Sequence, residues 1–204
     1  MSYTESGYST YFTVDTSEVL LVALYLRDSA GLRGAGRPAL PPLIPAVRRV
    51  ETRRLTEPFG GQAALRVEWE AWWHELLHQR VYDAVLPAPP LFEALNGMES
   101  LKALLRAHFG AAMAWAQERC AEYALHAGSR GAESMEYLLA RIIQERELEL
   151  GRASRRFTLQ VVELPLGVRR AWWVEPETLL MCQELFDDER SFRSYVEPVV
   201  RMLA

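Results

Sequence analysis

Two histidines and one glutamate occur at the spacing His74-Glu75-x-x-His78. On a helix, residues four apart project from the same face, so both imidazoles can bind one tetrahedral metal ion. Glu75 lies one position further round, where its carboxylate can act as a general base toward a metal-bound water. The chemistry that this spacing favours is zinc-dependent hydrolysis.

The motif resembles the His-Glu-x-x-His signature of the zincin metallopeptidases. The resemblance covers only these residues, and it implies His74 and His78 as zinc ligands and Glu75 as the catalytic base. In the gluzincin branch a glutamate from a later helix supplies the third ligand. Here the candidates are Glu122 first and Glu118 second.

The residues that follow the motif depart from the family pattern. His78 is followed by Gln79 and Arg80, where zincins usually have an uncharged and then an apolar residue. The longer metzincin form requires a glycine at the position of Val81 and a third histidine at the position of Ala84. These departures exclude the metzincins and leave zinc hydrolysis as an alternative hypothesis, with no cofactor as the leading expectation.

The segment that carries the motif also has a structural interpretation. Residues 62–86 have the apolar spacing of one amphipathic helix, with Trp69, Trp72 and Trp73 on its apolar arc. The two motif histidines fall at the border of that arc. Glu70 lies on the same four-residue row, so a carboxylate can pair with an imidazole without any metal.

Four arginines form a second candidate site: Arg48, Arg49, Arg53 and Arg54. Guanidinium groups bind phosphate or carboxylate in a bidentate manner, whereas the structural alternative is a solvated loop. The net charge of -4 gives no general affinity for polyanions, so nucleic acid is not an expected partner. An anion or nucleic-acid binder through this segment is the second alternative function.

A third candidate is the pair Trp172 and Trp173, which lies in an expected strand. Adjacent strand residues point to opposite faces, so at least one of the two indoles is expected near solvent or a partner. Tryptophan is enriched at binding hot spots as well as in cores. This pair therefore favours a protein-binding surface.

The length and composition of the chain restrict the kinds of protein that it can be. The chain has 204 residues, 50% hydrophobic and 25% charged, which is the balance of an ordinary globular domain that needs no disulfide or metal to fold. Cys120 and Cys182 stand alone, without a disulfide framework or a thiolate metal motif. Without a basic and apolar leader or a long apolar run, we expect a cytoplasmic location and no membrane association.

The expected architecture is α+β: one predominantly helical domain over residues 1–204 with a small antiparallel β-hairpin at 155–175. Pro- and Gly-rich connections are expected at 34–60 and 87–98. A capping box at Asp15–Glu18 predicts the start of the first helix, although the apolar run 19–26 is also consistent with a buried strand. The expected helices are 18–26, 62–86, 99–127, 133–150, 177–186 and 191–203, and the expected hairpin strands are 157–164 and 171–174.

The leading functional hypothesis is a non-catalytic intracellular interaction or assembly protein, such as an adaptor, an immunity-like protein or a complex subunit. It binds another protein, or a second copy of itself, through an aromatic and arginine-bearing surface. Enzymatic signals beyond the zinc motif are absent, because the sequence has no glycine-rich phosphate loop and no dinucleotide-binding fingerprint.

Overall fold

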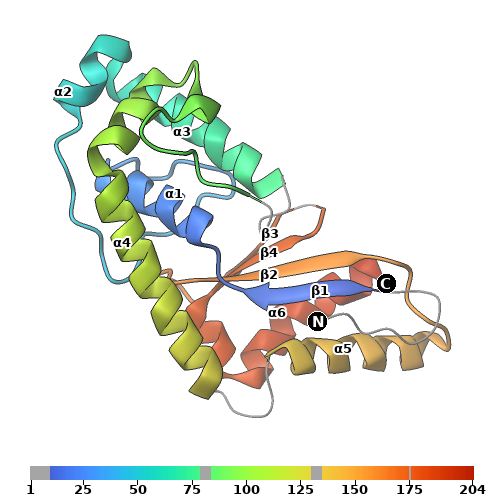
Figure 1. The fold of residues 1–204 in the computed structure, drawn as a ribbon. Helices are drawn as coiled ribbons and strands as arrows, with labels where there is room; N and C mark the ends of the chain where they lie inside the picture. The colour runs from blue at the N-terminus through green and yellow to red at the C-terminus, as the bar shows by residue number, and fades with distance from the viewer. Residues whose placement is uncertain (1–9, 79–83, 130–134, 175) are drawn as a thin grey trace. The chain divides into compact units, whose positions relative to one another are not determined.

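The computed structural model describes residues 10–78, 84–129, 135–174 and 176–204 (Figure 1). Helices predominate in these residues, which also contain one four-stranded sheet. The predicted α+β class is therefore confirmed. The chain divides into a helical unit, residues 17–122 and 165–167, and a sheet unit, residues 1–16, 123–164 and 168–204. The single domain expected from the sequence stays a prediction.

The first helix of the helical unit is α1 (Glu18–Ser29). Its N-cap is Ser17, whose hydroxyl accepts a hydrogen bond from the Leu20 backbone N–H at 3.4 Å. The predicted start of this helix at residue 18 is confirmed, but the predicted capping box is wrong, because the N-cap is Ser17 and Asp15 belongs to a strand. Six apolar residues of α1 are fully buried, which makes it a central helix of this unit: Leu20, Leu21, Val22, Ala23, Leu24 and Leu26.

The motif helix α3 (Gly61–His78) packs against α1. The indole N–H of Trp69 donates to the backbone carbonyl of Ala23 at 2.9 Å, and the rings of Trp69 and Trp73 stack 5.4 Å apart. Gly36 approaches the two indoles so closely that a Cβ there would lie 2.9 Å from Trp73 Cδ1. The expected apolar arc of the motif helix is thus its buried face.

The end of the motif helix differs from the expectation of a helix over 62–86. The α3 helix ends at His78, residues 79–83 lie outside the described residues, and residues 84–86 are not helical. Because a proline disfavours helical geometry in the residue before it, Pro87 explains the non-helical approach at Leu86.

The remaining elements of the helical unit are short, apart from α4. They are α2 (Arg53–Thr56), the 3-10 helices η1 (Glu57–Phe59) and η2 (Glu93–Leu95), and the first part of α4 (Glu99–Ser129). The expected Pro- and Gly-rich connections are largely irregular, although α2 and η1 lie within the first and η2 within the second.

The sheet unit contains strands β1 (Tyr11–Asp15), β2 (Thr158–Leu164), β3 (Ala171–Val174) and β4 (Thr178–Cys182). Their order is β1-β2-β4-β3, with β1 and β4 parallel to β2, and β3 antiparallel to β4. A C-terminal hairpin is present, but it joins β3 to β4. The expected pairing of residues 157–164 with 171–174 was wrong, because β4 lies between those strands.

Two elements of the sheet unit were read incorrectly from the sequence. Residues 177–186 were expected to be helical, yet they form β4 followed by the 3-10 helix η3 (Gln183–Asp187). Every residue of β4 is buried, and a short apolar run buried on both faces has no alternation that separates strand from helix. Strand β1 was not predicted at all.

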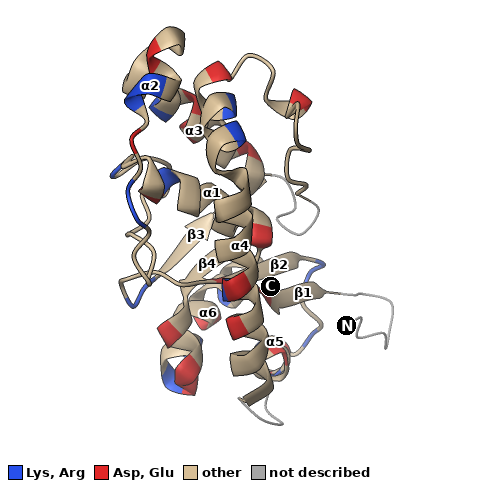
Figure 2. Ribbon diagram, turned by 60° about the vertical axis from the view of Figure 1, so that its left-hand side comes forward, with Lys and Arg blue, Asp and Glu red and all other residues tan. Residues whose placement is uncertain are grey.

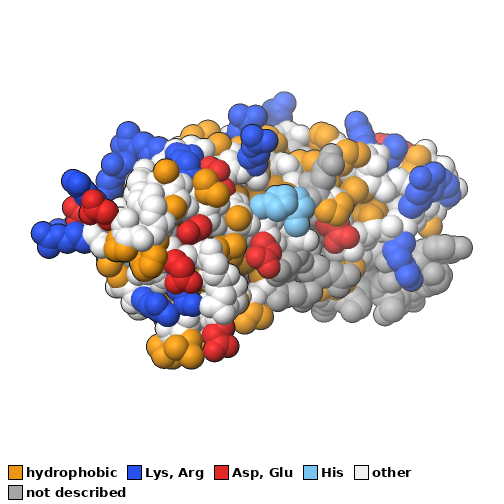
Figure 3. All heavy atoms as spheres, turned by 90° about the horizontal axis from the view of Figure 1, so that it is seen from above, with side chains coloured by type: hydrophobic (Ala, Val, Ile, Leu, Met, Phe, Trp, Pro, Cys, Tyr) orange, Lys and Arg blue, Asp and Glu red, His pale blue; other side chains and the backbone are white. Residues whose placement is uncertain are grey.

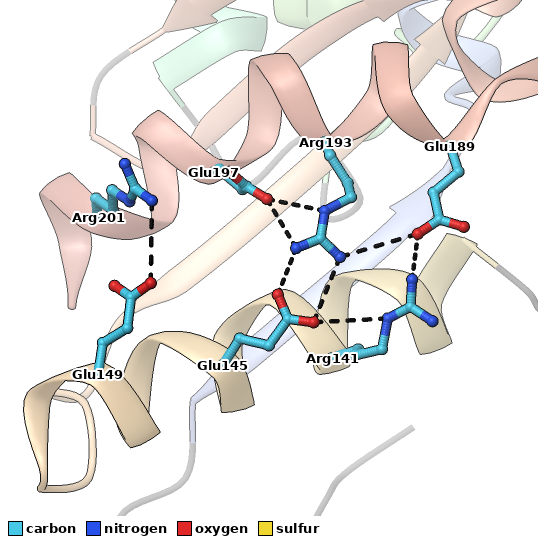
Figure 4. Close-up of polar contacts among 7 residues, drawn as sticks. All are labelled: Arg141, Glu145, Glu149, Glu189, Arg193, Glu197 and Arg201. Atoms are coloured by element: carbon cyan, nitrogen blue, oxygen red, sulfur yellow. Dashed lines mark hydrogen bonds and ion pairs between the residues drawn. The ribbon is translucent and has the colours of Figure 1, made fainter.

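Helices α5 (Met135–Leu150) and α6 (Glu189–Leu203) cover one face of the sheet (Figure 1) and confirm two of the expected helices. Buried side chains from both helices and from the strands form this core, among them Leu139, Ile142, Leu159, Val161, Leu179, Met181, Phe192 and Val196. A row of ion pairs joins the outer surfaces of α5 and α6, with Arg193 at its centre (Figure 4). Across the described ranges, none of the helices has the length and apolar character needed to cross a membrane.

Candidate functional site

Helix α3 holds the three motif residues at its surface, and His74, Glu75 and His78 are all exposed. The two imidazole rings lie with their centroids 3.9 Å apart, so the expected adjacency of these side chains is present. The Nδ1 atom of His78 lies 2.8 Å from the backbone oxygen of His74. Figure 3 shows histidine side chains at the surface of the face it draws.

The proposed third zinc ligands have other partners. Glu122 and Glu118 both pair with Arg119, at 2.8 and 3.4 Å. Glu70, which the sequence placed beside the histidines, pairs with Arg66 at 3.1 Å and accepts a hydrogen bond from the Gly36 N–H. In the described part of the chain, no group of three or more His, Cys, Asp or Glu residues could hold a metal ion. The zinc site stays a prediction.

The four candidate arginines occupy different environments. Arg53 and Arg54 lie on α2, where Figure 2 shows basic positions, and Arg53 pairs with Glu57 at 3.7 Å on an exposed surface. Arg48 is exposed on the preceding loop. Of the four, only Arg49 lines the pocket that is described below for the helical unit.

A charged pair, the buried Arg27 and the partly buried Asp28, holds the Pro-rich connection against the end of α1. Arg27 is 3% exposed, and its guanidinium donates to Asp28 at 2.7 Å and to the carbonyls of Leu40 and Pro41 at 3.0 and 2.8 Å. The second carboxylate oxygen of Asp28 accepts from the Leu43 N–H at 2.8 Å. These bonds satisfy backbone groups that a loop without secondary structure would otherwise leave unpaired.

Beside this pair lies a pocket with a volume of about 190 Å³. Its polar lining consists of Arg27, Asp28, Arg33 and Arg49, and its apolar lining includes Leu43. The lining arginines outnumber the single aspartate by two, so the formal net charge of the lining is +2. Arginine side chains in this arrangement can bind an oxyanion through charge-assisted hydrogen bonds.

In the sheet unit, the tryptophan pair occupies strand β3, which pairs with β4 alone among the strands in the described ranges. Trp172 and Trp173 are both half-buried. Trp173 packs against the core below the sheet, and its indole N–H has no hydrogen-bond partner among the described residues. Because neighbouring residues alternate, Trp172 projects from the opposite face.

The backbone of β3 offers hydrogen-bonding groups at its outer edge. The Cys182 N–H donates to the Arg170 carbonyl at 3.0 Å, and the register pairs Ala171 with Met181. In an antiparallel ladder, bonded and non-bonded pairs alternate, so the N–H and C=O groups of Ala171 and Trp173 point away from β4. These outward-facing N–H and C=O groups can form hydrogen bonds with another strand.

Sequence reasoning missed Arg27, Asp28 and Arg33. A signal for the first two was present: the segment 19–26 is apolar without a polar face, so the helix had to be buried on all sides. A charged pair in the last turn of such a helix is buried with it and therefore needs a partner.

In comparisons with known proteins, no family model, no curated protein and no solved structure matches this chain.

Proposed function

We propose that this protein is a non-catalytic interaction protein, which binds an extended, acidic segment of another protein along the outer edge of β3. The observation that carries the proposal is the unpaired edge of β3 in the described sheet, with two half-buried tryptophans on the same strand. A bound segment would extend the sheet by one strand, and its main chain would bond to Ala171 and Trp173.

Charge complementarity indicates the chemistry of that segment. Arg169 and Arg170 directly precede β3 and are both exposed. Arg169 donates a hydrogen bond to the hydroxyl of Ser191 at 3.1 Å, and its charge also acts on the nearby Asp188 carboxylate. Acidic side chains at one end of the segment would be attracted to these two exposed arginines, which would fix its direction along the strand.

The aromatic side chains would supply the specificity. Tryptophan contributes large rigid contact areas and is enriched among residues that dominate binding energy. Trp172 is positioned to contact alternate side chains of the added strand on its face of the sheet. A cytoplasmic location belongs to this proposal, since two lone cysteines without a disulfide framework are typical of reducing compartments.

The proposal can be tested with a displayed library of short random peptides selected against the purified protein. We expect the selected peptides to be acidic and to lose at least about tenfold in affinity in Ala171→Pro, because proline removes an outward N–H. Ala171→Ser keeps that N–H and serves as the matched control. Proline should be tolerated, since this N–H is not part of the β3–β4 ladder.

Two results would overturn the proposal. Peptides that bind Ala171→Pro as well as the unchanged protein would place binding elsewhere. Concentration-dependent dimerisation that Ala171→Pro abolishes would identify a second copy of this chain as the occupant of the edge.

A further inference from the structure

We infer that the pocket beside Arg27 and Asp28 is a phosphate-binding site, which takes the terminal phosphate of a small organic ester. The inference concerns the helical unit and is independent of the strand edge in the sheet unit. All the residues that line the pocket fall between Arg27 and Arg49.

The charge balance of the lining fits a doubly charged anion. Three arginines and one aspartate line the pocket, which leaves a net charge of +2 by subtraction. A phosphate monoester carries about -1.5 to -2 charges at neutral pH, whereas a carboxylate carries one. The pocket therefore complements phosphate better than a simple carboxylic acid.

The three lining arginines differ in how many of their N–H groups remain free to bind a phosphate. Arg27 has five N–H donors, and its hydrogen bonds to Asp28, Leu40 and Pro41 use three of them. Its position is fixed by these contacts, so any remaining donor is already oriented. Arg33 and Arg49 form no side-chain ion pair within the described ranges, and their guanidinium groups can turn toward a ligand.

The backbone around Gly31 and Val50 determines where the side chain of Arg49 lies. Gly31 has a φ of +69°, and a Cβ at this position would lie 3.3 Å from the guanidinium carbon of Arg49. Nearby, the Val50 N–H donates to the Ser29 carbonyl at 2.9 Å, which fixes the chain next to Arg49 against the end of α1. A cation at the C-terminal end of a helix is also favoured by the helix dipole, so Arg49 has a structural role that the test must separate from binding.

The volume of the pocket and its apolar lining residues further restrict the class of ligand that it can bind. A volume of about 190 Å³ is smaller than the roughly 300 Å³ at which pockets for drug-sized ligands begin. The rest of the lining is mainly apolar and includes Leu32, Leu43 and Val47. This arrangement suits a phosphate group joined to a compact apolar group.

Calorimetric titration at constant ionic strength tests the inference, with inorganic phosphate, phenyl phosphate and acetate as probes. We expect phenyl phosphate to bind more tightly than inorganic phosphate, and acetate to bind at least about tenfold more weakly than either. Arg33→Gln and Arg49→Gln should each weaken phosphate binding about tenfold, because each removes a charge-assisted bond.

Arg48→Gln is the matched control, because Arg48 is an exposed neighbour that does not line the pocket, and it should change the affinity less than about twofold. Urea unfolding of each variant separates a folding defect from lost binding. No phosphate binding by the unchanged protein would overturn the inference. Equal losses in Arg48→Gln and Arg49→Gln would also overturn it, since they would indicate diffuse charge, and equal affinity for acetate would exclude selection of a dianion.

Discussion

Arg193 on α6 and Glu145 on α5 form an ion pair that links the two helices over the core of the sheet unit (Figure 4). The same guanidinium also pairs with Glu197 at 2.8 Å and with Glu189 at 3.8 Å. Arg141 pairs in turn with Glu189 and with Glu145. The outer surfaces of α5 and α6 are therefore joined by a connected network whose centre is Arg193.

We expect Arg193→Met to destabilise the protein by about 1 kcal/mol, because partly exposed ion pairs are individually weak but this residue joins several. Arg201→Met is the matched control: Arg201 has a side-chain exposure of 59% and lies 4.0 Å from Glu149, so little change is expected. Urea unfolding followed by circular dichroism measures both variants. Equal effects of the two substitutions would show that the network contributes no more than isolated surface charges.

The network also predicts a pH dependence. Hydrogen bonding from Arg193 is the largest cause that lowers the pKa of Glu145, and the charges of Arg193 and Arg141 add to it while burial opposes it. A carboxyl group whose pKa is lower in the folded state stabilises the protein above its unfolded pKa, and that contribution is lost as the pH falls through the folded value.

The stability difference between the unchanged protein and Glu145→Gln should therefore be present near pH 7 and should shrink below about pH 4. Urea midpoints at neutral and acidic pH give this difference directly. A difference that is constant over the same range would show that the carboxylate charge of Glu145 does not contribute to folding.

Ser17 provides a prediction about the start of α1. Removing its hydroxyl in Ser17→Ala leaves the Leu20 N–H without its capping acceptor, and such changes cost roughly 1 kcal/mol. Ser17→Thr retains the hydroxyl and should restore part of the loss. If Ser17→Ala were as stable as the unchanged protein in thermal unfolding, this cap would have no energetic role.

Among these substitutions, we expect Asp28→Ala to cause the largest loss of folding stability. Asp28→Ala leaves the buried guanidinium of Arg27 without its carboxylate and the Leu43 N–H without an acceptor. Removing one partner of a buried ion pair typically costs about 3 kcal/mol or more. Glu57→Ala, which breaks the exposed pair with Arg53, should cost less than about 0.5 kcal/mol and is the control in the same denaturation series.

The histidine pair on α3 permits a test of the alternative zinc-hydrolase hypothesis. Structural and catalytic zinc sites use three or four protein ligands, whereas in the described residues His74 and His78 have no third ligand grouped with them. We therefore expect protein purified without a histidine tag to contain well below one zinc per chain. Elemental analysis beside His74→Ala and His78→Ala gives the answer. Stoichiometric zinc that both variants lose would contradict the non-catalytic proposal and direct attention to a third ligand and to Glu75.

Much of the helical content was predictable from the sequence because its signals are local. The α5 helix ends at Leu150 as predicted, since Gly151 adopts a positive φ that residues other than glycine rarely tolerate. The spacing of His74 and His78 placed both imidazoles on one side of α3 because helical periodicity depends on neighbouring residues only. The alternation of Trp172 and Trp173 follows in the same way from the period of a strand.

Other features depended on residues that are distant in the sequence. Whether Thr178–Cys182 is a strand or a helix was settled by its pairing with β2, since a fully buried apolar run carries no periodic signal. The assignment of β3 to a sheet edge likewise required the insertion of β4 beside β2.

The candidate sites show the same division. The sequence by itself determined which side chains share a helix face or alternate along a strand, because 3.6- and 2-residue periods are properties of the local backbone. Only the tertiary structure decided that Arg49 joins Arg27 and Arg33 in one pocket while Arg48 stays outside it. That grouping arises from long-range packing of an irregular loop on a buried helix, which no local pattern encodes.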